Sequence, residues 1–304
     1  MIKFLHREEI DTGKWDDVIA HSPAETLYPY SWYLDASAEN WSALVMDDYR
    51  FIMPLVWKKK YGIRYLYQPV LCQQLGLFSR EFTDPLVIRQ FVEILMKRFR
   101  FGVVHFNMLN MVGDDQAFEV DDRINYILPL EKNHKALVDA YSLNAKRNLK
   151  KSMETGAEVE KDISLEELMV FKKENDLTKK SEDRYRRMEY QFRSVLDHSK
   201  GSVYGIRYEG KLVAATFLAF SKTRIIYLLS VSNVAGKEQR AMFGIVDEAI
   251  RSFSGSSMIL DFEGSNIPSI ARFFSGFGAR PEVYQRLSFN RLPVPFLPGK
   301  RNGK

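Results

Sequence analysis

The feature of this sequence that most constrains its fold is an order of elements that occurs twice. In the first half, short apolar runs separated by the turns "DDYR" and "KKKYG" predict a strand meander over residues 41–70. Apolar residues spaced three and four apart after an Asp-Pro start predict a helix over 89–101, and a strand follows over 102–110. The second half repeats this order of meander, helix and strand over residues 201–231, 239–253 and 256–266. A repeat at half the chain length indicates a duplicated α/β unit.

The boundary between the two halves is predicted at the polar stretch 112–123. Domains usually hold about 100 to 200 residues, so two domains suit a chain of 304. We therefore expect domains over 1–123 and 124–304. Beyond the boundary, "INYILPL" predicts a strand, residues 131–156 predict helical segments that stop at a glycine, and 293–304 predict a loosely held tail.

The composition excludes several classes of protein. Hydrophobic residues make up 45% and charged residues 27%, which is typical of a globular chain with a buried core. The longest apolar runs, such as residues 212–220, are far shorter than the ~20 residues of a membrane-spanning helix. Cys72 is the single cysteine, and the five histidines show no metal-ligand spacing, so no metal is expected. The N-terminus lacks a secretory pattern, which favours a cytoplasmic location.

The net charge of +5 favours an anionic partner: a nucleotide, a nucleic acid or the inner membrane surface, through peripheral contact. The densest basic run is "SLNAKRNLKKS", residues 142–152, where Arg147 and Lys150 are candidate anion contacts. Its alternative is a solvated helix face whose cations complement the helix dipole.

The longer stretch "NAKRNLKKSMETGA", after a strand and a short helix, resembles one in the Fem-type peptidoglycan aminoacyltransferases. Those proteins belong to the GNAT superfamily of N-acyltransferases and are built from two tandem GNAT-like domains. The resemblance implies an α+β chain of two such domains, each a mixed, mostly antiparallel sheet flanked by helices. It also implies that 1–123 lies on the acceptor side and 124–304 on the donor side.

A second resemblance lies in "DFEGSNIPSIARFFSGFGA", residues 261–279, which is similar to the Asp-Phe-x-Gly segment of Fem-like proteins and to the last GNAT motif. In that motif an Asn, here Asn266, contacts the cofactor. A Tyr that protonates the leaving thiolate would stand at Phe274, so that general acid is absent. Asp261 and Glu263 are candidate bases, and the alternative is a structural pair of carboxylates beside a core helix.

The third stretch is "SVSNVAGKEQRAMFG", residues 230–244. In GNAT enzymes a splayed strand precedes this point and the following loop wraps the pyrophosphate at a helix N-terminus, which favours anions. The implied cofactor contacts are Ser232, Gly236, Lys237, Gln239, Arg240 and Ala241. One glycine stands where two small residues are expected, and Fem-type enzymes that use aminoacyl-tRNA also lack a proper coenzyme A loop. An ordinary strand-to-helix turn is the alternative.

Together these segments predict an N-acyltransferase that moves an acyl group from acetyl-CoA or another acyl-CoA to a small-molecule or peptide amine. Glu263 is the first choice of general base and Asp261 the second. Arg147 and Lys150 would hold the phosphates of the donor or the acceptor end of a tRNA.

The aromatic residues Tyr30 and Trp32 would line the acceptor cleft, unless they are core packing. Two further functions stay open. One is a Fem-type aminoacyltransferase that uses charged tRNA on a cell-wall precursor. The other is a catalytically silent GNAT-like module that binds a nucleotide, lipid head group or protein.

Overall fold

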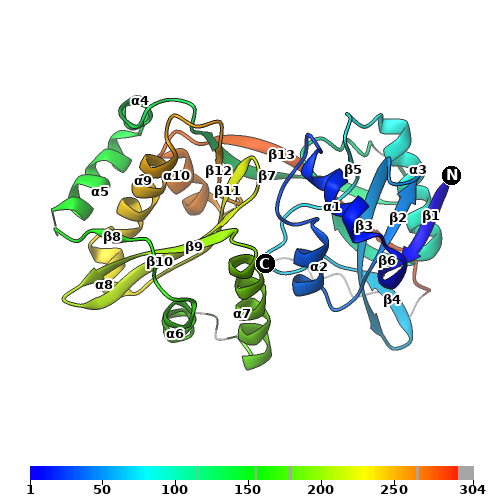
Figure 1. The fold of residues 1–304 in the computed structure, drawn as a ribbon, viewed down its shortest axis with the longest axis horizontal. Helices are drawn as coiled ribbons and strands as arrows, with labels where there is room; N and C mark the ends of the chain where they lie inside the picture. The colour runs from blue at the N-terminus through cyan, green and yellow to red at the C-terminus, as the bar shows by residue number, and fades with distance from the viewer. Residues whose placement is uncertain (114, 155, 177, 179, 265–266, 294–304) are drawn as a thin grey trace. The chain divides into compact units, whose positions relative to one another are not determined.

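The computed structural model describes residues 1–113, 115–154, 156–176, 178, 180–264 and 267–293. The chain forms two compact units: unit 1 comprises Met1–Arg123 and Val283–Lys304, and unit 2 comprises Ile124–Glu282 (Figure 1). The chain passes between the units within strands β7 (Glu119–Pro129) and β13 (Arg280–Asn290). The segment from Val283 onward, which the sequence analysis places with the second half, thus belongs to unit 1.

Unit 1 is a mixed, mostly antiparallel sheet with helices packed against it. Its strands follow the order β1 (Ile2–His6), β2 (Trp41–Met46), β3 (Phe51–Lys60), β4 (Ile63–Leu66), β6 (Phe101–His105) and β13, and β5 (Phe78–Ser79) pairs with β3. Its helices are a 3₁₀ turn (Arg7–Glu9), α1 (Thr12–Ala20), α2 (Ser31–Ser37) and α3 (Pro85–Arg98). Within this sheet, β4 and β6 run parallel and the other neighbours run antiparallel.

Unit 2 repeats this architecture. Its sheet has the order β7, β12 (Ile259–Asp261), β11 (Arg224–Ser232), β10 (Lys211–Phe220), β9 (Gly201–Tyr208) and β8 (Val159–Glu160). Its helices are α4 (His134–Asp139), α5 (Leu143–Met153), α6 (Leu165–Asn175), α7 (Glu182–Asp197), α8 (Val234–Glu238), α9 (Ala241–Phe253) and α10 (Pro268–Ser275). Here β11 and β12 form the parallel pair.

The predicted fold class and the repeated order of elements are confirmed in both units. The two meanders are β2–β3–β4 and β9–β10–β11, followed by α3 and β6 in unit 1 and by α9 and β12 in unit 2. Helix α3 begins at Pro85, before the predicted start, because the Asp84 side chain caps it by accepting a hydrogen bond from Leu86 N. Helices α6 and α7 fall in a segment for which the sequence analysis made no prediction.

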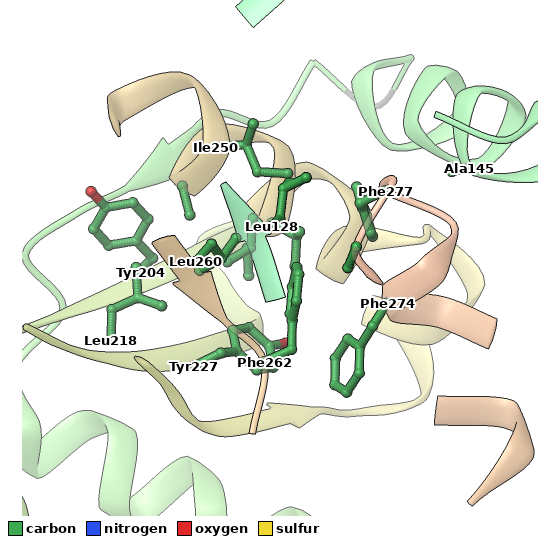
Figure 2. Close-up of a cluster of buried hydrophobic side chains, with 14 of the residues drawn as sticks. Leu128, Ala145, Tyr204, Leu218, Tyr227, Ile250, Leu260, Phe262, Phe274 and Phe277 are labelled. Carbon is green, nitrogen blue, oxygen red and sulfur yellow. The ribbon is translucent and has the colours of Figure 1, made fainter. Parts of the chain in front are cut away.

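The core of unit 2 holds the elements of its candidate site in place. Apolar side chains from β7, β10, β12, α9 and α10 meet there, and Figure 2 shows Leu128, Leu218, Leu260, Ile250 and Phe277 among them. Helix α5 packs against α9, and the contact is close at Gly244, where an added Cβ would lie 2.8 Å from Ser152 Oγ. The last turn of α5 therefore lies beside the first turns of α9.

Candidate functional site

Strands β11 and β12 pair over a short stretch in the sheet of unit 2. They pair from Arg224↔Ile259 to Ile226↔Asp261, where β12 ends, and within the described residues no further pairs follow, although β11 continues to Ser232. Aromatic rings gather just past the end of this pairing: Phe262 stacks on Phe274 with centroids 4.6 Å apart (Figure 2). A strand edge without a partner strand leaves backbone N–H groups available to a ligand.

The aromatic cluster includes the position at which the GNAT resemblance expects a catalytic Tyr. Phe274 is buried there and also contacts Tyr227, with ring centroids 6.1 Å apart. Tyr227 carries a phenol, and burial raises its pKa above the usual value while hydrogen bonds with Ser230 and Thr216 oppose that shift. The sequence analysis missed Tyr227, because a Tyr within an apolar strand carries no distinguishing signal.

The loop between β11 and α9 is built around Asn233 and Gly236. The Asn233 side chain accepts a hydrogen bond from Gly236 N (2.9 Å) and so caps the short helix α8. A Cβ added to Gly236 would lie 2.2 Å from the carbonyl oxygen of Val213 in β10. Close packing of α8 on β10 therefore accounts for this glycine.

The start of α9 carries two cations. Arg240 is its N-cap residue, in a left-handed conformation (φ 61°), and Lys237 lies one turn earlier in α8. Both side chains are exposed, and in the described part of the chain neither forms an ion pair. Cations at a helix N-terminus oppose the macrodipole, so an anion bound between them would relieve the repulsion.

The remaining residues of the predicted loop have different environments. Ala241 is buried in the core, and Ser232 is half-buried at the end of β11, where it pairs with Ala214. The Gln239 Oε1 atom is buried and, among the described residues, has no hydrogen-bond partner. Asn266 lies outside the described residues.

The basic run of residues 142–152 forms α5, capped by Ser142 Oγ, which accepts from Ala145 N (3.1 Å). Arg147 and Lys150 are exposed on this helix, and Arg147 Nη2 donates to Asn144 Oδ1 (3.1 Å). The Ser142 N–H also donates to Gly276 O (2.9 Å) at the end of α10. Because α5 contacts both α9 and α10, the structure brings the three segments singled out from the sequence into one region of unit 2.

The Asp261 carboxylate is buried and fully engaged. Arg224 Nη1 donates to Asp261 Oδ2 (2.7 Å), and the Arg224 guanidinium also forms a bidentate pair with Glu282 (2.8 and 2.9 Å). Burial lowers the pKa of Arg224, but the two carboxylates raise it further and keep the side chain charged. Glu263 N donates to Asp261 Oδ1 (2.9 Å). This geometry favours the structural alternative for Asp261.

Glu263 lies in a tight turn directly after β12. It is half-buried with φ 55°, and Gly264 follows with φ 50°. A Cβ added to Gly264 would lie 2.1 Å from the carbonyl oxygen of Ile124 in β7. The turn therefore packs closely against β7, and this packing fixes the position of Glu263.

Replacing Gly264 by Ala is expected to lower the free energy of unfolding by roughly 3 kcal/mol. The alanine would have to adopt a left-handed backbone conformation, and its Cβ would also clash with the backbone of β7. Gly255 is the matched control: its φ is +79° and nothing lies within 4 Å of an added Cβ. Gly255→Ala should cost only about 1 kcal/mol. Urea unfolding of the two variants measures the difference, and equal losses would contradict the close contact with β7.

Tyr30 and Trp32 lie at the start of α2 in unit 1. Their rings stack with centroids 6.1 Å apart, and Tyr30 Oη donates to Glu25 Oε1 (3.2 Å). Burial, and then the Glu25 carboxylate, raise the pKa of Tyr30 above its usual value. Both rings remain partly exposed, so they retain surface for a ligand.

Two kinds of feature are absent from the described residues. No group of three or more His, Cys, Asp or Glu side chains is placed to hold a metal ion. None of the described helices combines the length and apolar character needed to cross a bilayer.

Comparison with solved structures identifies the fold. FemX superposes with a TM-score of 0.64 at 11% identity, covering 93% of this chain and 96% of that one. L-PGS from Bacillus licheniformis gives 0.56 at 13% identity and covers 94% of each chain. A GNAT-family acetyltransferase from Colwellia psychrerythraea gives 0.54 at 10% identity, covering 95% of this chain and 100% of that one. No protein-family model matches the sequence, and no curated protein matches it in sequence.

The chain therefore has a fold like that of FemX and of the GNAT-family acetyltransferase, as the sequence resemblance implies. The likeness to FemX extends over nearly the whole length of both chains. At these identities the likeness establishes the fold alone.

Proposed function

We propose that the protein is an N-acyltransferase that moves an acyl group from acyl-CoA to an amine. The observation that carries this proposal is the start of α9, where Lys237 and Arg240 have no carboxylate partner in the described chain and come after strand β11, which extends beyond its last pair with β12. Such an arrangement suits the pyrophosphate of a coenzyme A whose thioester lies along the strand edge.

In the reaction, the amine nitrogen attacks the thioester carbonyl carbon, and the C–S bond breaks to release the thiolate of coenzyme A. Backbone N–H groups of β11 would stabilise the oxyanion, and holding both reactants together supplies much of the acceleration. Before the attack, Glu263 takes a proton from the ammonium form of the acceptor, directly or through water, and so generates the neutral amine. Asp261, held by Arg224, fixes the turn that carries Glu263.

Arg147 and Lys150 would extend the anion site along α5 toward the nucleotide end of the donor. Gln239, with its buried oxygen, is proposed to contact the donor as well. We propose that unit 1 supplies acceptor contacts through Tyr30 and Trp32, whose stacked rings suit a flat or hydrophobic part of the amine substrate.

One observation favours aminoacyl-tRNA as the donor instead. Gly236, the glycine of this loop, packs against β10, so it is not available for a close approach to a pyrophosphate. The structural likeness to FemX is compatible with this donor, because the sequence resemblance to Fem-type enzymes implies the use of aminoacyl-tRNA. The aromatic packing at Phe274 similarly supports the third function, a silent binding module, because no phenol stands at that position.

Thermal stability with added acetyl-CoA, longer acyl-CoAs and free coenzyme A tests the proposal. A ligand at 100 times its dissociation constant stabilises the folded state by about 2.7 kcal/mol. This shift should vanish in Lys237→Ala/Arg240→Ala. A variant with Lys132 and Lys135 replaced by Ala is the matched control, because it removes two exposed cations beside α4 and should keep the shift.

The outcomes separate the three functions. A shift that requires Lys237 and Arg240 places coenzyme A at α9. No shift with any thioester would exclude the acyl-CoA donor, and steeply salt-dependent binding of charged tRNA would then identify the aminoacyl-tRNA alternative. A bound ligand without turnover would favour the silent module.

A further inference from the structure

The β3–β4 hairpin of unit 1 presents a concentration of positive charge outside the candidate site. Figure 1 shows these two strands reaching beyond the neighbouring strand β6. Their register pairs Lys59 directly with Arg64 and Lys58 with Tyr65, and the turn at Tyr61 and Gly62 has positive φ at both residues. That turn suits the right-handed twist of a tight two-residue hairpin.

The charge of the hairpin is one-sided. Residues 51–68 contain four cations and no Asp or Glu, whereas the net charge of the whole chain is +5. Glu39, at 3.5 Å from Lys58 Nζ, partly offsets one of the four. Like charges that face each other across strands are destabilising, so the Lys59 and Arg64 pair is a cost that a bound anion would relieve.

Most aromatic rings of the hairpin are covered by its own cations. The Arg64 guanidinium lies 5.0 Å from the Trp57 ring and Lys58 Nζ 4.8 Å from the Tyr67 ring, and both rings are half-buried. Lys60 Nζ lies 5.3 Å from the Tyr61 ring, but Tyr61 stands at the tip and is 84% exposed. The hairpin thus offers one projecting aromatic side chain surrounded by cations.

We propose that the β3–β4 hairpin docks this protein on an anionic lipid bilayer. Tyr61 would enter the headgroup region, where Tyr side chains are favoured because one end is apolar and the other polar. Lys59, Lys60 and Arg64 would lie at the level of the lipid phosphates, and their flexible stems allow each charge to reach one. This surface lies in unit 1 and is independent of the donor chemistry proposed for unit 2.

A bilayer fits the hairpin better than a single-stranded nucleic acid. Nucleic-acid platforms stack successive bases on several open aromatic faces. Here the Trp57 and Tyr67 rings are half-buried beneath Arg64 and Lys58, so Tyr61, with Lys60 Nζ 5.3 Å from its ring, is the one exposed aromatic side chain among residues 51–68. One inserted aromatic side chain surrounded by cations suits an anionic bilayer, whose surface is continuous, fluid and negatively charged.

Co-sedimentation of the full chain with phosphatidylglycerol-containing and pure phosphatidylcholine vesicles tests the proposal. Binding is expected to the first and not to the second, and to weaken as salt rises. Lys59→Gln/Lys60→Gln should weaken binding about 30-fold, since each cation near an anionic surface contributes roughly one kcal/mol. Lys132→Gln/Lys135→Gln is the matched control and should bind like the wild type.

Insertion of the tip has its own readout. Tyr61→Trp should add tryptophan emission that brominated phosphatidylglycerol quenches, and Tyr61→Ser should weaken binding without changing the salt slope. The proposal is overturned if the wild type does not bind the anionic vesicles, or if the Lys59→Gln/Lys60→Gln variant binds them as the wild type does. It is also overturned if that variant keeps vesicle binding but loses binding to single-stranded RNA.

Discussion

Replacing Glu263 by Gln is expected to slow acyl transfer by about 10²–10⁴-fold, the usual contribution of a positioned general base. The amide keeps the size and hydrogen-bonding capacity of the side chain but cannot take the proton that the acceptor ammonium must lose before the amine attacks. Because Glu263 is half-buried in a turn held by Asp261 and Gly264, the substitution should leave the fold intact. Donor binding, measured by thermal shift, should therefore be unchanged.

The measurement is single-turnover transfer with the thioester that gives the largest thermal shift and a panel of primary amines. Glu209→Gln is the matched control, because Glu209 also has a left-handed backbone (φ 48°) but lies exposed in the β9–β10 turn. It should retain the full rate. Undiminished turnover in Glu263→Gln would rule out this residue as the base, and a loss of donor binding would show that it serves binding instead.

Replacing Arg224 by Met is expected to cost about 3–5 kcal/mol of unfolding free energy, because it leaves buried carboxylates without their cation. The Arg224 side chain is 6% exposed and its partners Asp261 and Glu282 are 1% and 16% exposed. The loss arises from uncompensated buried charge, so it should exceed the loss of apolar contact alone. Urea unfolding at neutral pH measures it.

Arg193→Met in α7 provides the comparison for this prediction. Arg193 also pairs with two carboxylates, Glu166 and Glu189, but its side chain is 49% exposed. Exposed pairs are screened by water, so this variant should lose far less unfolding free energy than Arg224→Met. Similar losses in both variants would mean that the Arg224 cluster contributes no more than a surface ion pair. A stable Arg224→Met protein with slowed transfer would point to a role in positioning Glu263.

Local sequence patterns predicted the repeated elements well because their signals are short-range. Apolar spacing of three and four residues marks α3 and α9, and turn residues separate the strands of both meanders. The Asp-Pro pair marks the start of α3, but the apolar spacing begins the predicted helix later because exposed Leu86 does not extend the apolar stripe. No prediction covers helices α6 and α7, although Phe192 of α7 stacks on Phe217 of β10 with ring centroids 4.2 Å apart.

The candidate site was predictable only in part. The basic run, the loop before α9 and the acidic segment after β12 were each recognisable by residue type. The partners of those residues were not. In the sequence, Arg224 lies 37 residues before Asp261 and Glu282 lies 21 residues after it. No local pattern links these residues to their partner. Likewise, no residue close to Gly236 in the sequence indicates that Gly236 packs against the backbone of Val213.

The sequence by itself determined the duplicated order of elements, the helix starts and the Fem-like GNAT resemblance, because periodicity, caps and motifs are properties of neighbouring residues. Only the tertiary structure decided that Asp261 is held in a buried ion pair while Glu263 leaves the same turn, and that Lys237 and Arg240 lack carboxylate partners in the described chain. The physical reason is that charge interactions and burial depend on distance in space, which the fold sets between residues far apart in sequence.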